Sequence, residues 1–381
     1  KEFFILKTIC PYCFKTIDLN KTDFRCASKL CLESGTTQRH IIPRKLAKVD
    51  RKGFATCDVE NCQKTTHTMV CNYCKHDLPD TISKSQTRII SIVGAKSSGK
   101  SYYVATLLRQ FMEEGLFTKV TKTGSTRFIQ NSREIYKTRY KDKMDNKIAL
   151  GGTNYVSDIV KDNPPVLVQF TYSTSRNKRV DNTYSFFDAA GESFNDAADL
   201  AAITPYISHS SAIIIILDPR QMDDVNRSIV AHMPKLGTVP VADDRYEDTI
   251  RNVATVLRDQ LRLRSDEKIK IPLCVAFSKW DLLIKTQDLL PADFIVSTPN
   301  LAGITGFDAD MVKNASDEIE SLLNKWAPGF VSAVNMDFKN ICYFGFSAWG
   351  LGSVDGTDVP AIASFRVEDP MLWIMKQNGL L

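Results

Sequence analysis

The segment Gly94–Ser101 constrains the fold of this chain more than any other feature, because it reads Gly-Ala-Lys-Ser-Ser-Gly-Lys-Ser. It matches the pattern G-x-x-x-x-G-K-[ST] in full. The β-branched run Ile89–Val93 precedes it, and a helical pattern begins at its second lysine. In this context the glycines let backbone N–H groups turn inward around a phosphate, and the helix N-terminus adds its positive end. The segment therefore predicts a strand, a phosphate-binding loop and a helix in succession.

Two side chains of this segment carry the expected chemistry. Lys100 is predicted to neutralise charge on the β- and γ-phosphates, and the Ser101 hydroxyl is predicted to ligate Mg²⁺. The residues expected to contact the nucleotide here are Gly94, Ala95, Lys96, Ser97, Ser98, Gly99, Lys100, Ser101 and Tyr102.

From Arg88 onward, apolar β-branched runs alternate with longer amphipathic segments. This alternation predicts an α/β fold with a mostly parallel sheet flanked by helices. We expect strands at 89–93, 166–172, 183–187, 213–217, 273–277 and 341–346, and helices from 100 and at 128–144, 246–263, 311–326 and 369–378. The basic turn 175–179 indicates a hairpin, hence one antiparallel edge. The stretch 118–165 fits the alternation badly, and we interpret it as an insert or a nucleotide-sensing region.

The cysteines define a separate N-terminal region, because eight of the ten lie between Cys10 and Cys74. Clustered cysteines in a reducing compartment are typical of metal ligands rather than disulfides. Eight thiolates predict two tetrahedral Zn²⁺ sites. The expected ligands are Cys10, Cys13, Cys26, Cys31, Cys57, Cys62, Cys71 and Cys74. We expect a zinc-ribbon-like domain over 1–80, a polar linker at 81–87 and the α/β domain over 88–381.

The spacing leaves the pairing of these cysteines open. Local pairing would join Cys10, Cys13, Cys26 and Cys31 in one site and the other four in the second, and it is favoured because short loops close at lower entropy cost. The nested alternative joins the two C-x-x-C pairs in one site and the two wider pairs in the other. The histidines 40, 67 and 76 are expected to lie beside the ligands or at the surface. Cys274 and Cys342 fall on expected buried strands and are predicted to be core residues.

Charge and hydropathy exclude several classes of protein. The 381 residues carry a formal net charge of +5, which is mild for this length. Residues 1–88 hold 16 Lys and Arg against 9 Asp and Glu. Eight thiolates with two Zn²⁺ lower that surplus to about +3, a weak footprint for nucleic acid. No apolar run approaches the roughly 20 residues that span a bilayer, and the start lacks the apolar stretch of a signal peptide. We therefore expect a cytoplasmic protein.

Three later segments point to the base and the metal. Asp188-Ala-Ala-Gly191-Glu192 follows an expected strand, and a strand ending in D-x-x-G favours Mg²⁺ binding by Asp188 and contact of Gly191 with the γ-phosphate. ATPases more often have a second acidic residue directly after the Asp, and here alanine follows.

Ser278-Lys279-Trp280-Asp281 directly follows another expected strand, and Ser347-Ala348 follows the last one. The Asp281 carboxylate can accept from guanine N1–H and N2–H₂, a pair of donors that adenine lacks. The Lys279 stem can lie on the base, and Ser347-Ala348 offers a backbone N–H to guanine O6. A helix N-cap is the alternative role of Asp281. Because ligands bind at the carboxyl ends of parallel strands, the order of the four segments predicts a guanine nucleotide site.

These residues resemble the translation-factor-related superclass of P-loop GTPases. C-P-Y-C-F, C-N-Y-C-K-H-D-L-P, G-A-K-S-S-G-K-S and F-F-D-A-A-G-E narrow the resemblance to the bacterial zinc-ribbon "double-GTPase" group. The resemblance implies GTP or GDP, Mg²⁺ and two Zn²⁺ as cofactors. It also implies a multi-component system with a role in defence or stress, and protein partners encoded in that system.

Two positions depart from the usual pattern. Ser278 replaces Asn or Thr, which weakens one expected bond to the phosphate loop. Glu192 stands where small GTPases keep a water-orienting Gln, and a carboxylate there repels the γ-phosphate, so hydrolysis is predicted to be slow. Lys100, Glu192 and Thr153 are the expected catalytic residues, with Thr153 as the sensing-loop ligand of Mg²⁺.

Other residues compete for the roles around the γ-phosphate. Thr121, Thr123 and Thr126 compete with Thr153, and a solvated loop threonine is the bland alternative. An arginine acting in cis would be Arg127, Arg133 or Arg139, for which a solvated helix face is the alternative.

A GTP-dependent molecular switch is the function that these observations favour. One alternative is a P-loop ATPase with a degenerate base site, which Ser278 suggests. The other is a zinc-ribbon module that binds protein or RNA and holds a structural nucleotide, which Glu192 and the cysteines suggest.

Overall fold

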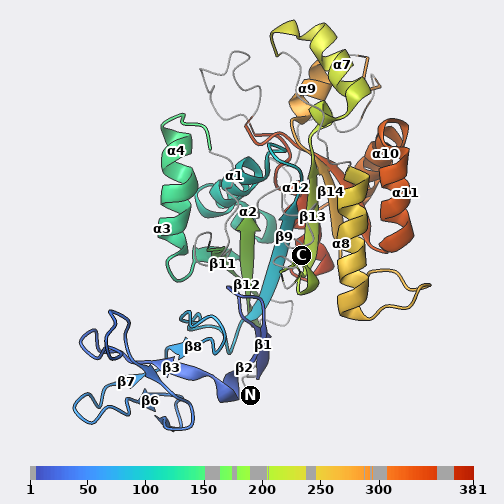
Figure 1. The fold of residues 1–381 in the computed structure, drawn as a ribbon. Helices are drawn as coiled ribbons and strands as arrows, with labels where there is room; N and C mark the ends of the chain where they lie inside the picture. Colours follow the sequence, from blue (N-terminus) through green and yellow to red (C-terminus); the bar gives the residue numbers. More distant parts are fainter. Residues whose placement is uncertain are drawn as a thin grey trace.

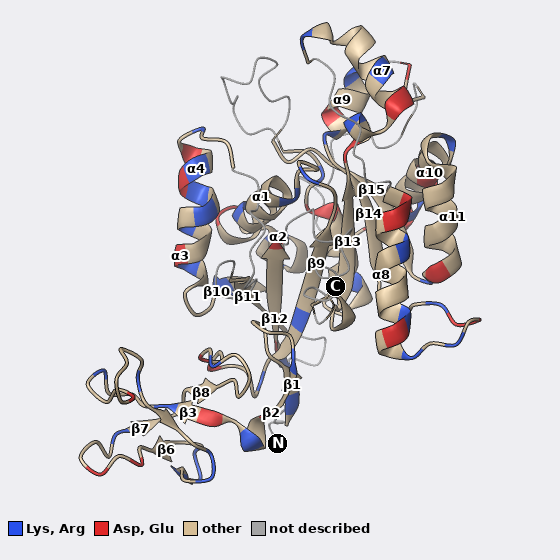
Figure 2. Ribbon diagram, in the orientation of Figure 1, with Lys and Arg blue, Asp and Glu red and all other residues tan. Residues whose placement is uncertain are grey.

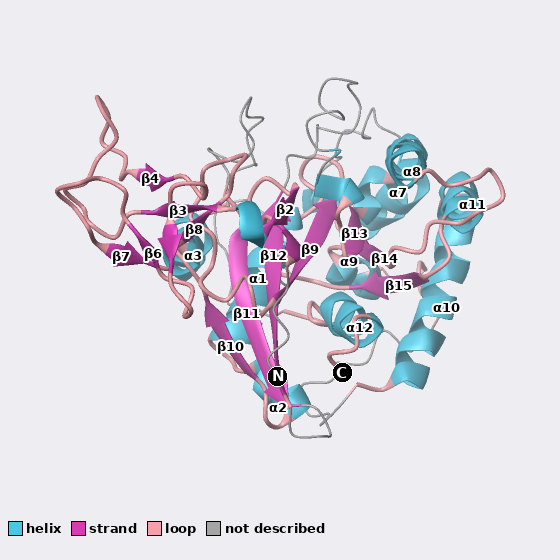
Figure 3. Cartoon of the chain, turned by 90° about the horizontal axis from the view of Figure 1, so that it is seen from below, coloured by secondary structure: helices cyan, strands magenta, loops and turns pink. Residues whose placement is uncertain are grey.

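A seven-stranded sheet organises most of the chain in this computed structural model. The structure describes residues 6–150, 164–173, 178–188, 204, 206–236, 246–286, 288–291, 294, 307–349 and 364–381. The strand order is β10-β11-β12-β9-β13-β14-β15, and Figure 3 shows these strands across the molecule from β10 to β15. The strands are β9 Gln86–Val93, β10 Ser125–Phe128, β11 Val166–Ser173, β12 Arg179–Asp188, β13 Ala212–Leu217, β14 Leu273–Phe277 and β15 Ile341–Gly345.

The pairing of these strands confirms the predicted mixed sheet. The strands β12, β9, β13, β14 and β15 are parallel, whereas β10 and β11 form an antiparallel edge. Each central strand is buried along its length, as expected for a sheet covered on both faces. The expected strands at 89–93, 166–172, 183–187, 213–217, 273–277 and 341–346 are all confirmed within a few residues at each end.

Helices cover both faces of the sheet (Figure 1). The helices are α1 Lys100–Met112, α2 Leu116–Thr121, α3 Ser132–Tyr136, α4 Asp142–Asp145, α7 Asp223–His232, α8 Tyr246–Leu261, α9 Trp280–Lys285, α10 Ala309–Trp326, α11 Pro328–Asp337 and α12 Asp369–Gln377. The side chains of α8, α10 and α11 pack on one face, and those of α1 and α12 on the other. Helix α8 has both acidic residues and arginines, so it has no charged face of a single sign (Figure 2).

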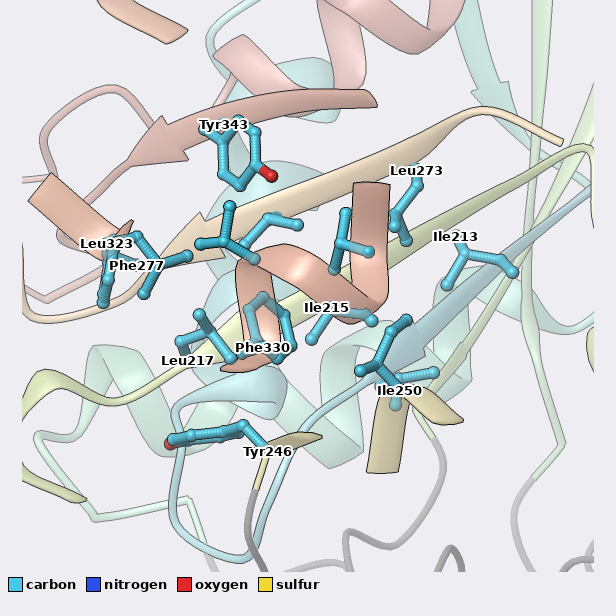
Figure 4. Close-up of a cluster of buried hydrophobic side chains, with 14 of the residues drawn as sticks. Ile213, Ile215, Leu217, Tyr246, Ile250, Leu273, Phe277, Leu323, Phe330 and Tyr343 are labelled. Carbon is cyan, nitrogen blue, oxygen red and sulfur yellow. The ribbon is translucent and has the colours of Figure 1, made fainter. Parts of the chain in front are cut away.

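The alternation of side chains along β13 divides the core into two layers. Ile213, Ile215 and Leu217 point toward α8 and α11, where they meet Ile250 and Phe330 (Figure 4). Ile214 and Ile216 point to the opposite face, toward α1. Cys274 and Cys342 are 0% and 4% exposed and lie opposite each other on β14 and β15, so the prediction that they are core residues is confirmed.

The stretch that fitted the α/β alternation badly contains a strand that the sequence analysis did not predict. Strand β10 pairs with β11 at the edge of the sheet. The charged helix expected at 128–144 begins at Ser132 and is interrupted by a π-helical turn at Lys137–Lys141. Its buried side chains, Tyr136, Tyr140 and Met144, pack on the same face as α1.

The N-terminal region is built from short strands and turns. Its strands are β1 Lys7–Ile9, β2 Thr16–Asp18, β3 Asp23–Arg25, β4 Ile41–Ile42, β5 Lys48–Val49, β6 Ala55–Thr56, β7 Thr65–Thr66 and β8 Met69–Val70. They form a β1-β2 hairpin and two three-stranded sheets, β4-β3-β8 and β5-β6-β7. The hairpin lies beside the lower part of β9, and the two small sheets project away from the large sheet (Figure 1).

Candidate nucleotide and metal sites

The loop from Gly94 to Gly99 connects β9 to α1 and has the shape that the sequence pattern requires. Gly99 has φ of +99°, in the left-handed region where an L side chain is strained. A Cβ on Gly94 would lie 2.5 Å from the carbonyl oxygen of Ile216, so only glycine fits beside β13. Lys100 is 6% exposed, and its Nζ donates to the carbonyl oxygens of Gly94 and Ala95 at 2.8 and 2.9 Å. The ammonium group is therefore held against the loop whose backbone surrounds the phosphates.

Two of the three predicted Mg²⁺ ligands, Ser101 in the first turn of α1 and Asp188 at the end of β12, contact each other. The Ser101 hydroxyl donates to Asp188 Oδ2 at 2.6 Å, and Asp188 is 3% exposed. A hydroxyl and a carboxylate are oxygen donors of the kind that Mg²⁺ takes in nucleotide sites. The residues present thus fit the metal, with Ser101 and Asp188 as its protein ligands.

Ser278 and Lys279 connect the end of β14 to the phosphate loop and to β13. The Ser278 hydroxyl donates to the carbonyl oxygen of Leu217 at 3.2 Å, and its Cβ lies 3.5 Å from the position that a Cβ on Gly99 would occupy. Lys279 has φ of +52° and its ammonium forms an ion pair with Asp218, a carboxylate that is 1% exposed. Asp218 therefore fixes the side chain that is expected to lie along the base.

Asp281 and Ser347 join the last two segments. Ser347 Oγ accepts from the Asp281 backbone N–H at 2.9 Å and donates to Asp281 Oδ1. The N-terminal cap of α9 is Lys279 rather than Asp281, and no side chain caps this helix. The N-cap alternative for Asp281 is therefore wrong, and its carboxylate is held toward the loop that begins at Ser347. The carbonyl oxygen of Ala348 accepts from Thr106 of α1 at 3.0 Å, which ties that loop to the helix.

Trp280, in the middle of the Ser278–Asp281 segment, is fully buried against Gly345. A Cβ on Gly345 would lie 2.4 Å from the indole ring. The close approach requires glycine at the end of β15 and fixes the backbone between Lys279 and Asp281.

We expect Gly345→Ala to destabilise the fold by about 1–3 kcal/mol, because it overpacks a rigid aromatic contact. It should also weaken binding of a guanine nucleotide, because the displaced indole shifts its two neighbours. Gly329→Ala is the matched control, since its new methyl group would first meet the end of the half-exposed Glu247 side chain, which can move. Thermal unfolding and nucleotide titration of both variants measure the effect. Equal melting temperatures for the two variants would contradict the prediction.

Tyr140 is a site residue that the sequence analysis missed. It lies in the π-helical turn, is 2% exposed, and is close enough to Asp188 for the charge of that carboxylate to act on it. Burial raises the pKa of Tyr140 well above its usual value, and the negative charge of Asp188 adds to the rise. A π-helical turn in a helix often marks a functional position, but the sequence pattern carries no signal for it.

Of the three candidate arginines, Arg139 is the one that directly precedes Tyr140 in the sequence. Its guanidinium carbon is 5.8 Å from the centroid of the Tyr140 ring. The positive charge of Arg139 lowers the pKa of Tyr140, but burial and the charge of Asp188 raise that pKa by more. Arg127 instead donates to Gln169 on the neighbouring strand at 2.7 Å, and Arg133 is exposed.

Asp218 and Gln221 were also missed, although they follow the central strand directly. Gln221 Nε2 donates to the carbonyl oxygen of Lys96 in the phosphate loop at 3.0 Å. The Tyr246 hydroxyl contacts Gln221 and accepts from the Asp218 backbone N–H at 2.8 Å. A buried acidic residue at the end of a central strand is the sequence signal that could have found Asp218.

Several predicted residues lie outside the described part of the chain. These are Thr153, Gly191 and Glu192. Among the competing threonines, Thr121 donates to the carbonyl oxygen of Phe117 and Thr126 to that of Phe111, so both hydroxyls have local partners. Thr123 lines a small cavity of about 340 Å³ beside Lys376 and the C-terminus.

The eight clustered cysteines form two compact sets of four. The first set is Cys10, Cys13, Cys71 and Cys74, and the second is Cys26, Cys31, Cys57 and Cys62. Within each set the sulfur atoms lie within 4.8 Å of one another, with pairs at 3.5 to 3.9 Å. Four sulfurs at about 2.3 Å from a tetrahedral Zn²⁺ are separated by about 3.8 Å, so both sets fit that ion.

This grouping corrects the pairing that we favoured from the sequence. Local pairing is wrong, and the nested alternative is the one the structure adopts. Strand β3, which ends at Arg25, pairs with β8, which leads into Cys71, and this brings the second C-x-x-C pair back to the first. The loop-closure penalty grows only slowly with loop length, so strand pairing outweighs it.

Backbone geometry and one buried ion pair support the two sets. Phe14, Lys75 and Gln63 each follow the second cysteine of a pair and have φ between +50° and +60°. Arg25, 8% exposed, lies between the two sets and donates to Asp77 at 2.8 Å and to the carbonyl oxygen of Lys75 at 2.7 Å. The expected roles of the histidines are consistent with this, since both sets are complete without them, and His40 Nε2 lies 2.7 Å from Asp58.

The strand ends, the phosphate loop and the base-binding segments together define a P-loop GTPase. The sequence profile of the Double-GTPase 2 family matches residues 88–327, which is more than half of the chain. The chain therefore belongs to the Double-GTPase 2 family. Binding of a guanine nucleotide follows from that family and from the site.

Solved structures of GTPases also match the chain. They include the Arl6 BBS3 small GTPase from Trypanosoma brucei with GppNp, 10% identical over 77% of this chain and 98% of that chain, with a TM-score of 0.30. The SRb-GTP/SRX complex of the signal recognition particle receptor from Chaetomium thermophilum is 14% identical over 76% and 97%, with a TM-score of 0.31. The Ski7 GTPase-like domain from S. cerevisiae bound to GTP is 11% identical over 77% and 50%, with a TM-score of 0.32.

These TM-scores are low, so the fold assignment depends on the family match and on the strand topology. No curated protein matches the sequence of this chain. Among the described helices, none has the length and apolar character to cross a bilayer.

Proposed function

We propose that this protein is a GTP-dependent molecular switch with a low intrinsic rate of hydrolysis, working with protein partners in a multi-component system. The observation that carries the proposal is the convergence of four segments at the carboxyl ends of β9, β12, β14 and β15. They are the phosphate loop, Asp188, the Ser278–Asp281 segment and the Ser347–Ala348 loop. The low rate and the partners follow from Glu192 and from the resemblance to zinc-ribbon double-GTPases.

The residues divide the work of binding between phosphate, metal and base. Ser101 and Asp188 would hold Mg²⁺, which would supply positive charge to the phosphates of the bound nucleotide. The backbone N–H groups of the loop and Lys100 orient the same phosphates. Asp281 accepts from the guanine edge, and adenine would leave this carboxylate without donors. Thr153 is proposed as the ligand that orders the sensing loop when the γ-phosphate is present.

Arg139 is our proposed arginine in cis. It adjoins Tyr140, a buried tyrosine whose pKa is raised by burial and by the nearby charge of Asp188, the predicted Mg²⁺ ligand. An arginine near that site can stabilise the charge that spreads over the transferred phosphoryl group. Its loss should lower the hydrolysis rate and leave binding of GDP unchanged.

Zinc completes the proposal on the N-terminal side. Two Zn²⁺ ions, one in each set of four cysteines, would hold together a region whose own apolar core is small. We propose a structural role for both ions, and docking of a protein partner to this region.

Nucleotide extraction from the purified protein, with metal analysis of the same sample, tests the proposal. We expect about one equivalent of GDP or GTP per chain and about two equivalents of zinc, because the described residues form one nucleotide site and two sets of four cysteines. Titration calorimetry with GDP and ATP adds the base preference. Equal affinity for both nucleotides would overturn guanine specificity, and ATP turnover well above GTP turnover would favour the ATPase alternative.

We expect Glu192→Gln to raise the single-turnover rate of GTP hydrolysis by about tenfold or more, because the amide can orient water without repelling the γ-phosphate. The affinity for GDP should stay the same, because GDP has no γ-phosphate. Rapid-quench measurement of phosphate release checks the rate, with Glu318→Gln on α10 as a control. An unchanged rate would show that Glu192 does not limit hydrolysis, and a lower rate would show that its carboxylate is needed. Either result would contradict the proposal that Glu192 makes the switch slow.

A further inference from the structure

The first cysteine set lies against the strand that carries the Mg²⁺ ligand. The turn that holds Cys10 and Cys13 packs on the face of β12 opposite α1, and the Ser185 hydroxyl donates to the carbonyl oxygen of Pro11 at 3.0 Å. Ser185 is fully buried and lies three residues before Asp188. Figure 1 shows the β1-β2 hairpin beside β9 and β12, whereas the second cysteine set belongs to the part that projects away.

Phe14, which directly follows Cys13, packs into the core of the large domain. It is 3% exposed and has φ of +60°. Its ring centroid lies 5.7 Å from that of Phe187 and 5.0 Å from that of Tyr206, and the last two rings lie 4.7 Å apart. Phe187 immediately precedes Asp188. A cluster of three aromatic rings in edge-to-face and tilted contact therefore connects the cysteine turn to the residue before Asp188.

The Tyr206 hydroxyl contacts the backbones of both β9 and β12 close to the ends of these strands. Its hydroxyl lies 2.7 Å from the carbonyl oxygen of Ile90 and 2.8 Å from that of Phe187, to which its one hydrogen can be donated. It also accepts from the Ile92 backbone N–H at 3.1 Å. Ile92 pairs with Asp188 in the register of the two strands. These contacts set the spacing between the phosphate loop strand and the Mg²⁺ strand.

Because Tyr206 is buried, the backbone groups that its hydroxyl contacts have no water to replace it. Tyr206 is 2% exposed, and burial raises the pKa of its hydroxyl well above the usual value, with the charge of Asp188 adding to the rise. The Tyr206 hydroxyl therefore stays neutral and remains the shared hydrogen-bond partner of the Ile90 and Phe187 carbonyl groups and the Ile92 N–H. A buried backbone group that loses such a partner must find another, which shifts the strand.

We infer that Phe14 and Tyr206 are positioning residues for Asp188, through which an intact first cysteine set strengthens Mg²⁺-dependent binding of the nucleotide. This inference rests on the proposed function, because it requires a guanine nucleotide site that uses Asp188. The turn that holds Cys10 and Cys13 keeps the Phe14 ring in a fixed position against Phe187. Without it, Phe187 and Tyr206 repack, and the Asp188 carboxylate moves relative to Ser101. The projecting second set makes no described contact with these residues.

The ratio of nucleotide affinity in Mg²⁺ to nucleotide affinity in EDTA isolates this effect. In the wild-type protein Mg²⁺ is expected to strengthen GTP binding. Phe14→Ala should reduce that gain by about tenfold, a typical coupling between neighbouring sites. The affinity measured in EDTA should change much less, because the phosphate loop and the base site remain. Phe54→Ala, at a partly exposed phenylalanine in the same N-terminal region, is the matched control and should leave both affinities unchanged.

Three further variants keep the test decisive if Phe14→Ala folds poorly. Tyr206→Phe preserves the ring contacts and removes only the hydroxyl, so its Mg²⁺ gain should also fall while its zinc content stays at the wild-type value. Cys13→Ser should lose about one equivalent of zinc together with the Mg²⁺ gain. Phe14→Leu, which keeps an apolar side chain in place, should recover part of the gain.

The outcomes separate this inference from the proposed function. If the wild-type protein binds no guanine nucleotide, the proposed function fails. If it binds one with a clear Mg²⁺ gain, and folded Phe14→Ala and Tyr206→Phe keep that gain, the positioning role is overturned. An equal loss of affinity in Mg²⁺ and in EDTA would also overturn it, because such a loss indicates general damage to the nucleotide site.

Discussion

Replacing Lys100 by alanine should abolish measurable binding of guanine nucleotides, with a loss of affinity of about 100-fold or more. The side chain is almost fully buried and points into the phosphate loop, where its ammonium is held by the carbonyl oxygens of Gly94 and Ala95. The β- and γ-phosphates would therefore be left without this charge-assisted partner.

Fluorescence titration with a labelled GDP and a labelled GTP measures this loss. Lys119→Ala is a suitable control, since Lys119 is exposed on α2. The loss should be larger for GTP than for GDP, because Lys100 serves both the β- and the γ-phosphate. Retention of wild-type GTP affinity by a folded Lys100→Ala protein would show that the loop does not bind the phosphates as we describe.

Replacing Asp281 by alanine should remove the preference for guanine, lowering GTP affinity by about 100- to 1,000-fold while ATP affinity changes little. Two hydrogen bonds to a charged acceptor are lost together. The Ser347 hydroxyl already orients the Asp281 carboxylate. The side chain of Asp281 therefore loses little conformational entropy when it binds the base. The effect is therefore expected on base selection rather than on phosphate binding.

Competition between GTP, GDP, ITP and ATP resolves this prediction. Inosine lacks the N2 amino group, so the wild-type protein should bind ITP less tightly than GTP, and Asp281→Ala should bind the two nearly equally. Asp259→Ala on the exposed side of α8 provides the control. A parallel fall in GTP and ATP affinity would mean that Asp281 supports the fold of the loop and does not read the base.

The alternation of β-branched runs with helical segments was sufficient to predict where the parallel strands of the large sheet lie in the sequence, though not their order in the sheet. Burial on both faces gives such strands continuous apolar sequences, as in Ala212–Leu217. Strand β10 was not predicted, because Ser-Thr-Arg-Phe at an exposed edge has neither an apolar run nor a clear period. The interruption of the following helix by a π-helical turn also has no sequence signature, since it depends on how Tyr140 packs.

The zinc pairing shows where local reasoning fails. The two C-x-x-C pairs are almost sixty residues apart, and nothing in their spacing indicates that β3 and β8 bring them together. Entropy favours short loops only weakly, whereas a pair of hydrogen-bonded strands fixes the partners. The same holds for Asp218 and Lys279, which lie 61 residues apart and meet because β13 and β14 are neighbours.

The sequence by itself was sufficient to predict the phosphate loop, the candidate Mg²⁺ ligands, the candidate base-binding segment and the eight clustered cysteines. Each of these predictions depends on residue types at short, fixed spacing. Only the tertiary structure decided which cysteines share a site, that Asp218 pairs with Lys279, and that Phe14 packs against Phe187. These contacts join segments distant in sequence, and the strand pairing that brings them together is a property of the whole fold.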